Sequence, residues 1–394
     1  MYLLFKVLTR TGFKYSSGIL TTFLIISCFP ANISAQGKSY PFNVSAWYKA
    51  LSINKSDQDK ADVNLTLFMT NIGSINTFNT GLGFTLVQNN FKGVNINAGV
   101  TSISGNSSGF ILSAAGNLHR GNVKGLEIGG LFNTTTRSME GVQIAGTVNY
   151  TTENFTGSQI SLVVNVAGDN FKGIQIGNSN IAGKNLSGVQ LGTTFNAVAY
   201  YLKGLQIAPG NIAGINNGVQ IGLLNVNSVN NVFQLGLVNI TDYQKGIPVG
   251  AVNIATKNGG ASWINFSSTF AAYTTGIKIN AADFVSYLEG SYNIFDTKNT
   301  KSGSIAAYYG YDFRIGKKFL LTPNAGYAEI FEDKSEEDSW IHQFAVQARL
   351  IGEMEITKNL RFIAGIGYSY RVQSKSGDDF SKNQFIGMAG FSIF

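Results

Sequence analysis

The stretch QFAVQARLIGEMEI at residues 343–356 alternates between two kinds of side chain. Successive side chains of a β-strand point to opposite faces, so alternation predicts a strand with two different faces. The apolar face holds Phe344, Val346, Ala348, Leu350, Gly352, Met354 and Ile356. The other face holds Gln343, Gln347, Arg349, Glu353 and Glu355, with Ile351 as the single break in its polar pattern and the small Ala345 beside them. A strand between lipid and a polar lumen has this pattern.

The flanking segments repeat the pattern. Residues 305–315, 319–327 and 360–371 alternate in the same way. The connections at 316–318 and 357–359 are short, whereas those at 296–302, 331–341 and 372–383 are longer and polar. Short and long connections alternate in outer-membrane barrels, as periplasmic turns and external loops. We therefore expect residues 261–394 to supply strands of a transmembrane antiparallel β-barrel.

The chain ends on an apolar row, FIGMAGFSIF at residues 385–394. A last strand that ends in Phe resembles the assembly signal of outer-membrane β-barrels, although Ser392 stands where that signal usually has an apolar or aromatic residue. The resemblance implies that Phe394 belongs to the signal. It also implies that the barrel-assembly machinery and outer-membrane lipid are partners of the chain.

The N-terminus has the features of an export signal. Lys6, Arg10 and Lys14 precede an apolar segment at 18–29, and Ala35 is a small residue at the expected cleavage position. This order predicts a secretory signal peptide over residues 1–35. An alternative is that the segment ending at Cys28 is a lipobox, which would make Cys28 a lipid-anchored first residue.

Composition excludes several classes of protein. Cleavage after Ala35 would remove the only cysteine, so the mature chain would have no disulfide and no thiolate metal site. Removing three leader cations from 29 Lys+Arg leaves 26 against 22 Asp+Glu, a balance of +4. That charge is too small to indicate nucleic acid as a partner. No mature segment reaches the roughly 20 apolar residues that a spanning helix needs.

Residues 93–260 form an internal repeat, preceded by expected N-terminal β-strands at 36–92. Glycines begin successive units sixteen residues apart at Gly93, Gly109, Gly125, Gly141, Gly157 and Gly173, and the spacing later shrinks to fourteen. Each unit reads Gly, apolar, Gln, apolar, Gly or Ala, and then reaches an Asn. A repeat of this length indicates either strands of a barrel or coils of a solenoid.

In the first interpretation each unit is one barrel strand with its turn. The whole mature chain would then form a barrel of roughly 20 strands. The Gln positions, among them Gln143, Gln175 and Gln206, would line its lumen. The sixteen-residue units keep one parity of apolar residues throughout, which favours this interpretation.

In the second interpretation each unit is one coil of a β-solenoid, with Gly at the corners and Gln stacked in a ladder. An eight-stranded barrel, closed by residues 42–53 and seven C-terminal segments, would carry it. The parity of apolar residues flips between Ile221 and Leu224, which requires a bulge or corner at Gly222. Identical units in antiparallel strands would also be unusual. We take the barrel with the repeats in its wall as the main prediction.

The Gly-x-Gln-x-Gly…Asn units resemble the glycine-rich surface repeat of cell-envelope proteins in Gram-negative bacteria. The resemblance covers about 170 residues. It implies an envelope location, and it assigns no functional residue.

Catalytic patterns are missing from the sequence. His119 lies between repeats beside Arg120, and His342 begins a strand, so both are expected to be solvated loop histidines. Neither has a nucleophile at a recognisable spacing. We expect no enzyme, no metal site and no cofactor.

The remaining candidates are charged residues on the lumen face of the C-terminal strands: Arg314, Arg349, Arg361, Arg371, Asp312, Glu353 and Glu355. They form either an ion-pair network that fills the barrel or a charged constriction that selects solutes. The expected function is a passive channel or a structural surface protein of the cell outer membrane. The alternative is a surface-exposed binding or adhesion module, with the repeats as a solenoid on a small barrel.

Overall fold

The structure, a computed structural model, describes residues 37–48, 51–53, 56–294, 302–334, 339–372 and 383–394. Every regular element among these residues is a β-strand, which confirms the predicted all-β class. Accordingly, no helix of the described residues is long and apolar enough to cross a membrane. The expected leader, 1–35, lies outside the described residues. The chain divides into two compact units, 1–201 and 202–394, and each is described by itself.

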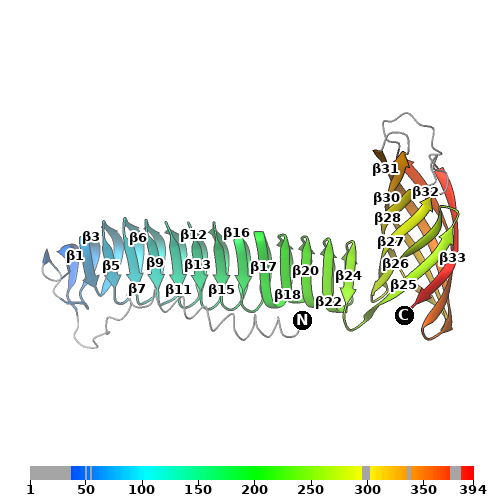
Figure 1. Cartoon of the computed structure of the whole chain (residues 1–394). Helices are drawn as coiled ribbons and strands as arrows, with labels where there is room; N and C mark the ends of the chain where they lie inside the picture. Colours follow the sequence, from blue (N-terminus) through cyan, green and yellow to red (C-terminus); the bar gives the residue numbers. More distant parts are fainter. Residues whose placement is uncertain (1–36, 49–50, 54–55, 295–301, 335–338, 373–382) are drawn as a thin grey trace. The chain divides into compact units, whose positions relative to one another are not determined.

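Unit 1 is a stack of coils, which Figure 1 shows as successive strands side by side. From residue 91 to residue 167, each coil contributes one strand of seven residues and one of four, here called the long and the short strand. The strands of unit 1 are β1 (Ser39–Trp47), β2 (Leu51–Ser52), β3 (Lys60–Ile72), β4 (Ser74–Gly81), β5 (Phe84–Val87), β6 (Phe91–Asn97), β7 (Val100–Ile103), β8 (Ser107–Ser113), β9 (Gly116–His119), β10 (Val123–Gly129), β11 (Phe132–Thr135), β12 (Met139–Ala145), β13 (Val148–Thr151), β14 (Phe155–Ser161), β15 (Val164–Ala167), β16 (Phe171–Ala182) and the first part of β17 (Leu186–Ile207).

Neighbouring coils pair in parallel and in register. Long strand β12 pairs with β14, which places Gln143 beside Gln159, and short strand β13 pairs with β15, which places Asn149 beside Asn165. Each residue therefore stacks on its equivalent sixteen positions away. This pairing is that of a β-solenoid. The alternative prediction is confirmed, and the main prediction, with the repeats in a barrel wall, is wrong.

The parity of the apolar positions misled the main prediction, because the chain can turn a corner without changing whether odd or even positions face inward. In unit 1 the inward residues Gln143 and Asn149 lie on different strands, β12 and β13, yet are six positions apart. In the fourteen-residue units the inward residues Gln220 and Asn225 are five positions apart, so the parity flips. That flip occurs at Gly222, between β19 and β20, where a corner was expected.

The glycine column follows from close contact between coils. Gly157 has a φ of +130°, and a Cβ atom there would lie 1.8 Å from the carbonyl oxygen of Gly141. Residues with side chains avoid this φ, and a backbone atom that close cannot be accommodated. Only glycine fits, which accounts for the sixteen-residue spacing that reveals the repeat.

Unit 2 contains further coils and then a barrel. The coil strands after β17 are β18 (Gly210–Asn216), β19 (Val219–Ile221), β20 (Leu224–Asn230), β21 (Phe233–Leu235), β22 (Val238–Gln244), β23 (Ile247–Val249) and β24 (Val252–Ala255). The barrel strands are β25 (Gly259–Ser268), β26 (Ala271–Ala281), β27 (Phe284–Ile294), β28 (Ser302–Tyr311), β29 (Phe313–Ile315), β30 (Phe319–Lys334), β31 (Ser339–Thr357), β32 (Leu360–Val372) and β33 (Asn383–Ile393).

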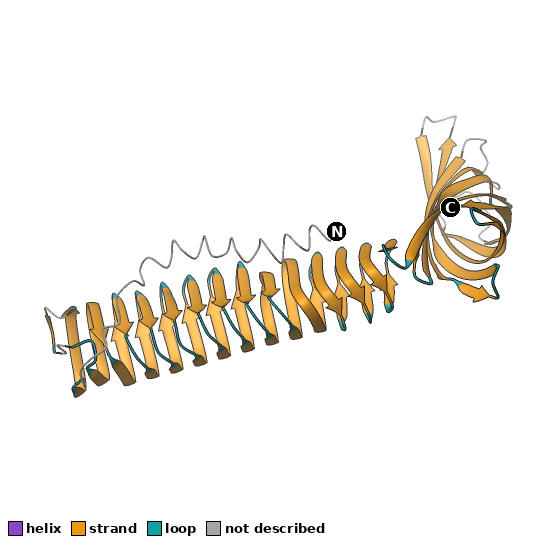
Figure 2. Ribbon diagram, turned by 90° about the horizontal axis from the view of Figure 1, so that it is seen from below, coloured by secondary structure: helices purple, strands orange, loops and turns teal. Residues whose placement is uncertain are grey.

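The barrel is closed and antiparallel, as its curved wall in Figure 2 shows. Its strands pair in chain order, and β33 pairs with β25 through Trp263 and Ile393, which closes the ring. Strand β29 continues β28, and both pair with β30, so the wall has eight strands. The segment expected to close the barrel, 42–53, does not: β1 pairs in parallel with β3 instead.

The two faces of the barrel wall differ as the alternation predicted. Val346, Leu350 and Met354 on β31 are exposed on the outside, whereas Arg349 and Glu353 are buried. Ile351 and Ala345, the apolar residues on the polar face, are 2% and 0% exposed and belong to the interior apolar cluster. The interior is therefore mixed, with apolar residues packed around buried charges.

The glycine column can be tested at Gly157. We expect Gly157→Ala to destabilise the neighbouring coils by at least about 1–3 kcal/mol, because the φ is strained for alanine and a Cβ would meet the Gly141 carbonyl. Limited proteolysis of the full chain in increasing urea measures the loss. Ser158→Ala, at the next residue, is the matched control. Equal resistance of the two variants would contradict the role of the column.

Candidate functional site

The barrel interior holds a buried arginine. Arg349 on β31 donates from Nη1 and Nη2 to the two carboxylate oxygens of Glu289 on β27, at 2.7 and 2.9 Å. Its Nε donates to Asn324 Oδ1 at 2.9 Å, and its guanidinium carbon lies 3.3 Å from the ring centroid of Tyr308. Both side chains of the ion pair are 2% exposed. The pair thus joins strands far apart in the barrel wall.

A second buried cluster surrounds Lys278 on β26. The ammonium donates to both carboxylate oxygens of Asp312, at 3.0 and 2.9 Å, and also to Glu353 Oε1. Asp312 accepts further hydrogen bonds from Asn280 and Thr322. A lysine inside a protein is rarely tolerated unless it is paired. The two carboxylates provide that pairing, and the cluster occupies interior space.

The other predicted lumen residues occupy different environments. Arg371 is buried, and its Nη2 donates to Gln384 Oε1 at 3.3 Å. Arg361 is partly exposed, with Nη1 3.5 Å from Glu353 Oε2. Glu355 is half-buried. Arg314 contradicts the prediction: it is exposed on the short strand β29, beside the turn, because the alternation breaks down there.

Sequence analysis missed the partners of these charges. Lys278 and Glu289 are the single charges of the strands β26 and β27. Each lies at alternate positions with buried neighbours, as Glu289 does with Val285 and Tyr287. A single charged residue at an inward-facing position of a strand without other charges was therefore the sequence feature that could have identified Lys278 and Glu289.

Phe394 lies at the end of the last barrel strand. Its amide donates to Asn359 O at 3.1 Å, and the Arg361 guanidinium carbon lies 4.3 Å from its ring centroid. The residue is half exposed, so the ring remains accessible at the barrel rim. Its role in assembly stays a prediction.

The solenoid interior holds a column of glutamines. Gln159 Nε2 donates to Gln143 Oε1 at 3.0 Å, and Gln175 Nε2 donates to Gln159 Oε1 at 2.8 Å. In unit 2, Gln220 donates likewise to Gln206 at 2.7 Å. Gln143, Gln175 and Gln206 are fully buried, so they lie inside the coils rather than along a barrel lumen. In-register stacking, which the main prediction lacked, places them there.

A column of asparagines runs beside it with the opposite hydrogen-bond direction. Asn133 Nδ2 donates to Asn149 Oδ1, the next coil along the chain, at 3.0 Å. The second Nδ2 hydrogen reaches the backbone oxygen of Ile144 on a long strand, at 2.8 Å. The Gln side chains donate toward lower residue numbers and the Asn side chains toward higher ones. The two columns therefore carry opposed dipoles.

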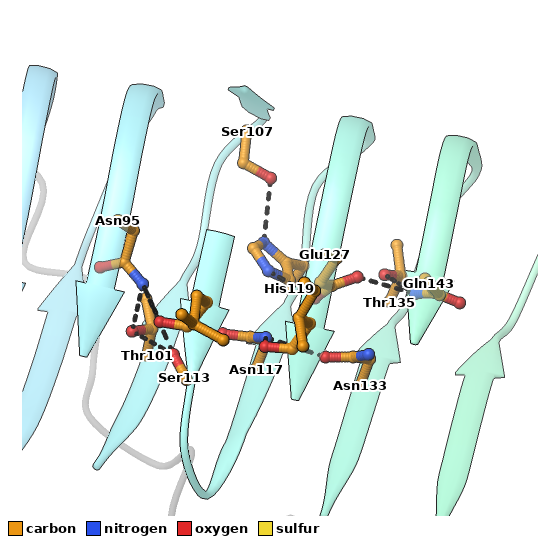
Figure 3. Close-up of polar contacts among 12 residues, drawn as sticks. Asn95, Thr101, Ser107, Ser113, Asn117, His119, Glu127, Asn133, Thr135 and Gln143 are labelled. Atoms are coloured by element: carbon orange, nitrogen blue, oxygen red, sulfur yellow. Dashed lines mark hydrogen bonds and ion pairs between the residues drawn. The ribbon is translucent and has the colours of Figure 1, made fainter. Parts of the chain in front are cut away.

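The glutamine column ends at a buried Ser–His–Glu string, drawn in Figure 3. Gln143 Nε2 donates to Glu127 Oε2 at 2.8 Å. The other Glu127 oxygen lies 2.8 Å from His119 Nε2, and His119 Nδ1 lies 3.0 Å from Ser107 Oγ. His119 is 1% exposed, so its prediction as a solvated loop residue was wrong, because β9 turns it inward. His342 is exposed, as expected.

The string resembles the residue set of a nucleophilic hydrolase, but its setting differs. A nucleophile has to reach a substrate, and Ser107 is 3% exposed. All three side chains face the solenoid interior between stacked coils. Among the described residues, no group of three or more His, Cys, Asp or Glu side chains offers a metal site.

The surface of unit 1 carries a shallow polar groove. It is lined by stacked asparagines, Asn90, Asn106 and Asn122, with Lys124 and Glu140 at its side. The asparagines hydrogen bond along the stack, since the Asn90 Oδ1 atom accepts a hydrogen bond from the backbone N–H of Asn106 at 2.9 Å. The groove offers amide, ammonium and carboxylate groups to a polar ligand.

Comparisons with known proteins find partial structural matches only. No protein-family model matches the chain, and no curated protein matches it. Two solved structures match part of it. Neisserial surface protein A (NspA) is 17% identical, with a TM-score of 0.26, over 34% of this chain and 93% of that chain. The N-terminal β-barrel domain of Pseudomonas aeruginosa OprF is 15% identical, with a TM-score of 0.27, over 34% and 96%.

The interior ion pair can be tested at Arg349. We expect Arg349→Met to destabilise the barrel by about 3–5 kcal/mol, because Glu289 would remain as an uncompensated buried charge. The temperature at which the folded form is lost in electrophoresis measures the change. Arg349→Met combined with Glu289→Met should recover most of the loss. A double variant as unstable as the single one would contradict the pairing.

The glutamine column can be tested at Gln159. Gln159→Leu would remove the bonds that Gln159 makes to Gln143 Oε1 and Gln175 Nε2, which keep only their 3.3 Å bonds to Thr151 and Ile181. We expect a loss of about 1–3 kcal/mol in total. Amide hydrogen exchange should rise in β12, β14 and β16. Thr156→Leu, an exposed site on the same strand, is the control. Unchanged exchange in Gln159→Leu would show that the column does not support the coils.

Proposed function

We propose that the chain is an outer-membrane protein in which the eight-stranded barrel is an anchor and the solenoid is a non-catalytic binding or structural module. The observation that carries the proposal is the side-chain distribution of the barrel. Its interior is filled by the Arg349 and Lys278 ion-pair clusters, and its exterior is apolar.

The exterior supports the membrane location. Ile277, Leu288, Ile305, Val346 and Ile366 are exposed on five different barrel strands. Water-soluble proteins rarely expose apolar surface so widely. A closed ring also pairs its backbone groups internally, which hydrocarbon requires of any spanning structure.

The interior supports an anchor rather than a channel. Eight strands enclose a space that side chains can fill. Tyr287, Tyr308 and Ile330 are buried there beside the ion pairs. The repeats, which would have widened the barrel as wall strands, form their own stack, whose interior is filled by amide columns and buried apolar side chains such as Phe155.

The solenoid supports a binding or structural role. Its coils expose a long surface of repeated side chains, as solenoid proteins do for extended partners. The groove beside Asn106 and Lys124 is the candidate site for a polar ligand such as a glycan. We propose no catalysis, because the Ser107–His119–Glu127 string is buried.

Conductance and fractionation test the proposal together. The full-length protein should fractionate with the outer membrane, and after reconstitution in planar bilayers it should give no large open steps, because its interior is filled. A general porin in the same bilayers confirms that insertion is detected. Large steps would favour a passive channel, and recovery in a soluble fraction would refute the membrane location.

A further inference from the structure

The outside of unit 1 is divided into two edges of opposite character. Between residues 91 and 201, nine charged side chains lie on one edge, here called the charged edge: Lys92, Arg120, Lys124, Arg137, Glu140, Glu153, Asp169, Lys172 and Lys184. The remaining carboxylate of this segment, Glu127, is buried. Ion pairs between neighbouring coils follow this edge, such as Lys184 Nζ to Asp169 Oδ1 at 2.9 Å.

The opposite edge is the corner between the long and the short strand of each coil, here called the apolar edge. The corner residues Leu131, Leu162 and Val163 are 55%, 79% and 47% exposed. Long strands of seven residues separate this corner from the charged edge by roughly 20 Å. No charged residue occupies a corner between a long and a short strand from β6 to β15.

The apolar character continues on both sides of the corner. On the long strands the outward side chains near the corner include Ile96, Ile160 and Ile176, which are 43%, 38% and 41% exposed. On the short strands Val148 and Val164 face outward and are partly exposed. The apolar surface therefore wraps around the corners that hold Leu131, Leu162 and Val163, while the other corners from β6 to β15 carry only Ala, Gly or Thr.

The backbone of the apolar edge is satisfied within the chain. The Gly130 amide donates to Ser113 O at 3.0 Å, and the Leu131 amide donates to Ala115 O at 2.8 Å. The next corner repeats the pattern, since the Thr147 amide donates to Leu131 O at 2.8 Å. The turns of the charged edge carry the same bonds, such as Thr136 N to His119 O at 2.8 Å, so the coils satisfy these backbone groups at both edges. Such pairing is what a turn in hydrocarbon requires.

We infer that the solenoid is itself a lipid-binding element, whose apolar edge enters the acyl-chain region of a membrane surface while its charged edge faces water. The inference goes beyond the polar-ligand groove of the proposed function by adding lipid as a partner of the opposite edge, and it rests on the membrane location of the barrel.

Lipid suits this surface better than a second copy of the chain. A protein partner with a flat face would cover one side of the corner and leave the other exposed. Fluid hydrocarbon covers a convex edge on all sides. The composition agrees, because the large exposed side chains at and beside the corner, such as Leu131, Leu162 and Ile160, are aliphatic. The strongest contacts of protein interfaces come instead from Trp, Tyr and Arg. Elements that lie in the membrane interface have this two-sided character.

Site-specific fluorescence in one coil tests the inference. In a Cys28→Ser background, Leu131→Cys places a label on the apolar edge, and Thr136→Cys places one on the charged edge of the same coil. Val346→Cys on the barrel exterior reports membrane insertion. The full chain is reconstituted in phosphatidylethanolamine–phosphatidylglycerol vesicles, with or without lipids brominated on the acyl chains. An environment-sensitive dye is attached to each cysteine.

We expect brominated lipid to quench most of the emission at positions 131 and 346 and little at 136, with a blue shift at 131. Aqueous iodide should quench position 136 alone. If position 346 is quenched by lipid while 131 responds to iodide as 136 does, the inference fails and the barrel anchor stands. If neither 131 nor 346 senses lipid, the proposed function fails as well. Cross-linking of Leu131→Cys to itself, without lipid quenching, would assign the edge to a second copy.

Discussion

Parallel, in-register stacking is the constraint on which the solenoid depends. Once a coil lies on its equivalent sixteen residues away, each inward side chain meets the side chain at the same position of the next coil, such as Gln143 beside Gln159 and Phe155 beside Phe171. A column of identical charges would repel, whereas apolar side chains can stack, as the rings of Phe155 and Phe171 do. Primary amides meet the requirement, because each one offers both a donor and an acceptor to its neighbours. Gln159 and Asn149 also reach backbone oxygens on the opposite strand, so the columns cross-link the two layers as well as the coils.

A directional hydrogen-bond column needs a suitable end, and the Ser107–His119–Glu127 string is that end. The glutamines donate toward lower residue numbers, so the last group must accept without having to donate. The carboxylate of Glu127 does this where an amide would present its own hydrogens. On the N-terminal side, a second column, Asn43, Asn64, Asn79 and Asn95, donates toward higher numbers. Ile111 separates the two columns, which point toward each other. The buried His119 therefore lies where the glutamine column and the N-terminal asparagine column end.

The sequence predicted the barrel strands more securely than the solenoid. Alternation is a local property, so residues 343–356 revealed both faces of β31 without knowledge of any partner. The fold of the repeats depends on how the strands of one unit pair with those of the next, and the sequence of a single unit does not show that pairing. The even spacing of Gln143 and Asn149 concealed a corner, while the odd spacing of Gln220 and Asn225 revealed one. The site residues show the same difference between local and long-range information. Arg349 and Glu353 were predicted from the alternation of one strand, whereas their partners Glu289 and Lys278 could be identified only from the closed barrel.

Both parts of the chain bury charged or amide side chains beside apolar ones and expose aliphatic side chains. In the barrel the alternation of the wall strands produces this distribution. In the solenoid the inward positions of the coils hold the amide columns, while Ile and Leu occupy many of the outward positions. The amide columns share the solenoid interior with a column of apolar side chains, in which the rings of Phe155 and Phe171 stack with their centroids 5.3 Å apart. The buried amide donors and acceptors satisfy one another, so aliphatic side chains of the repeat can face outward. Between residues 91 and 201 the exposed charges lie on the edge opposite the corners, together with the exposed Tyr200 and Tyr201, and this separation of charge from the corners is what points to two different environments.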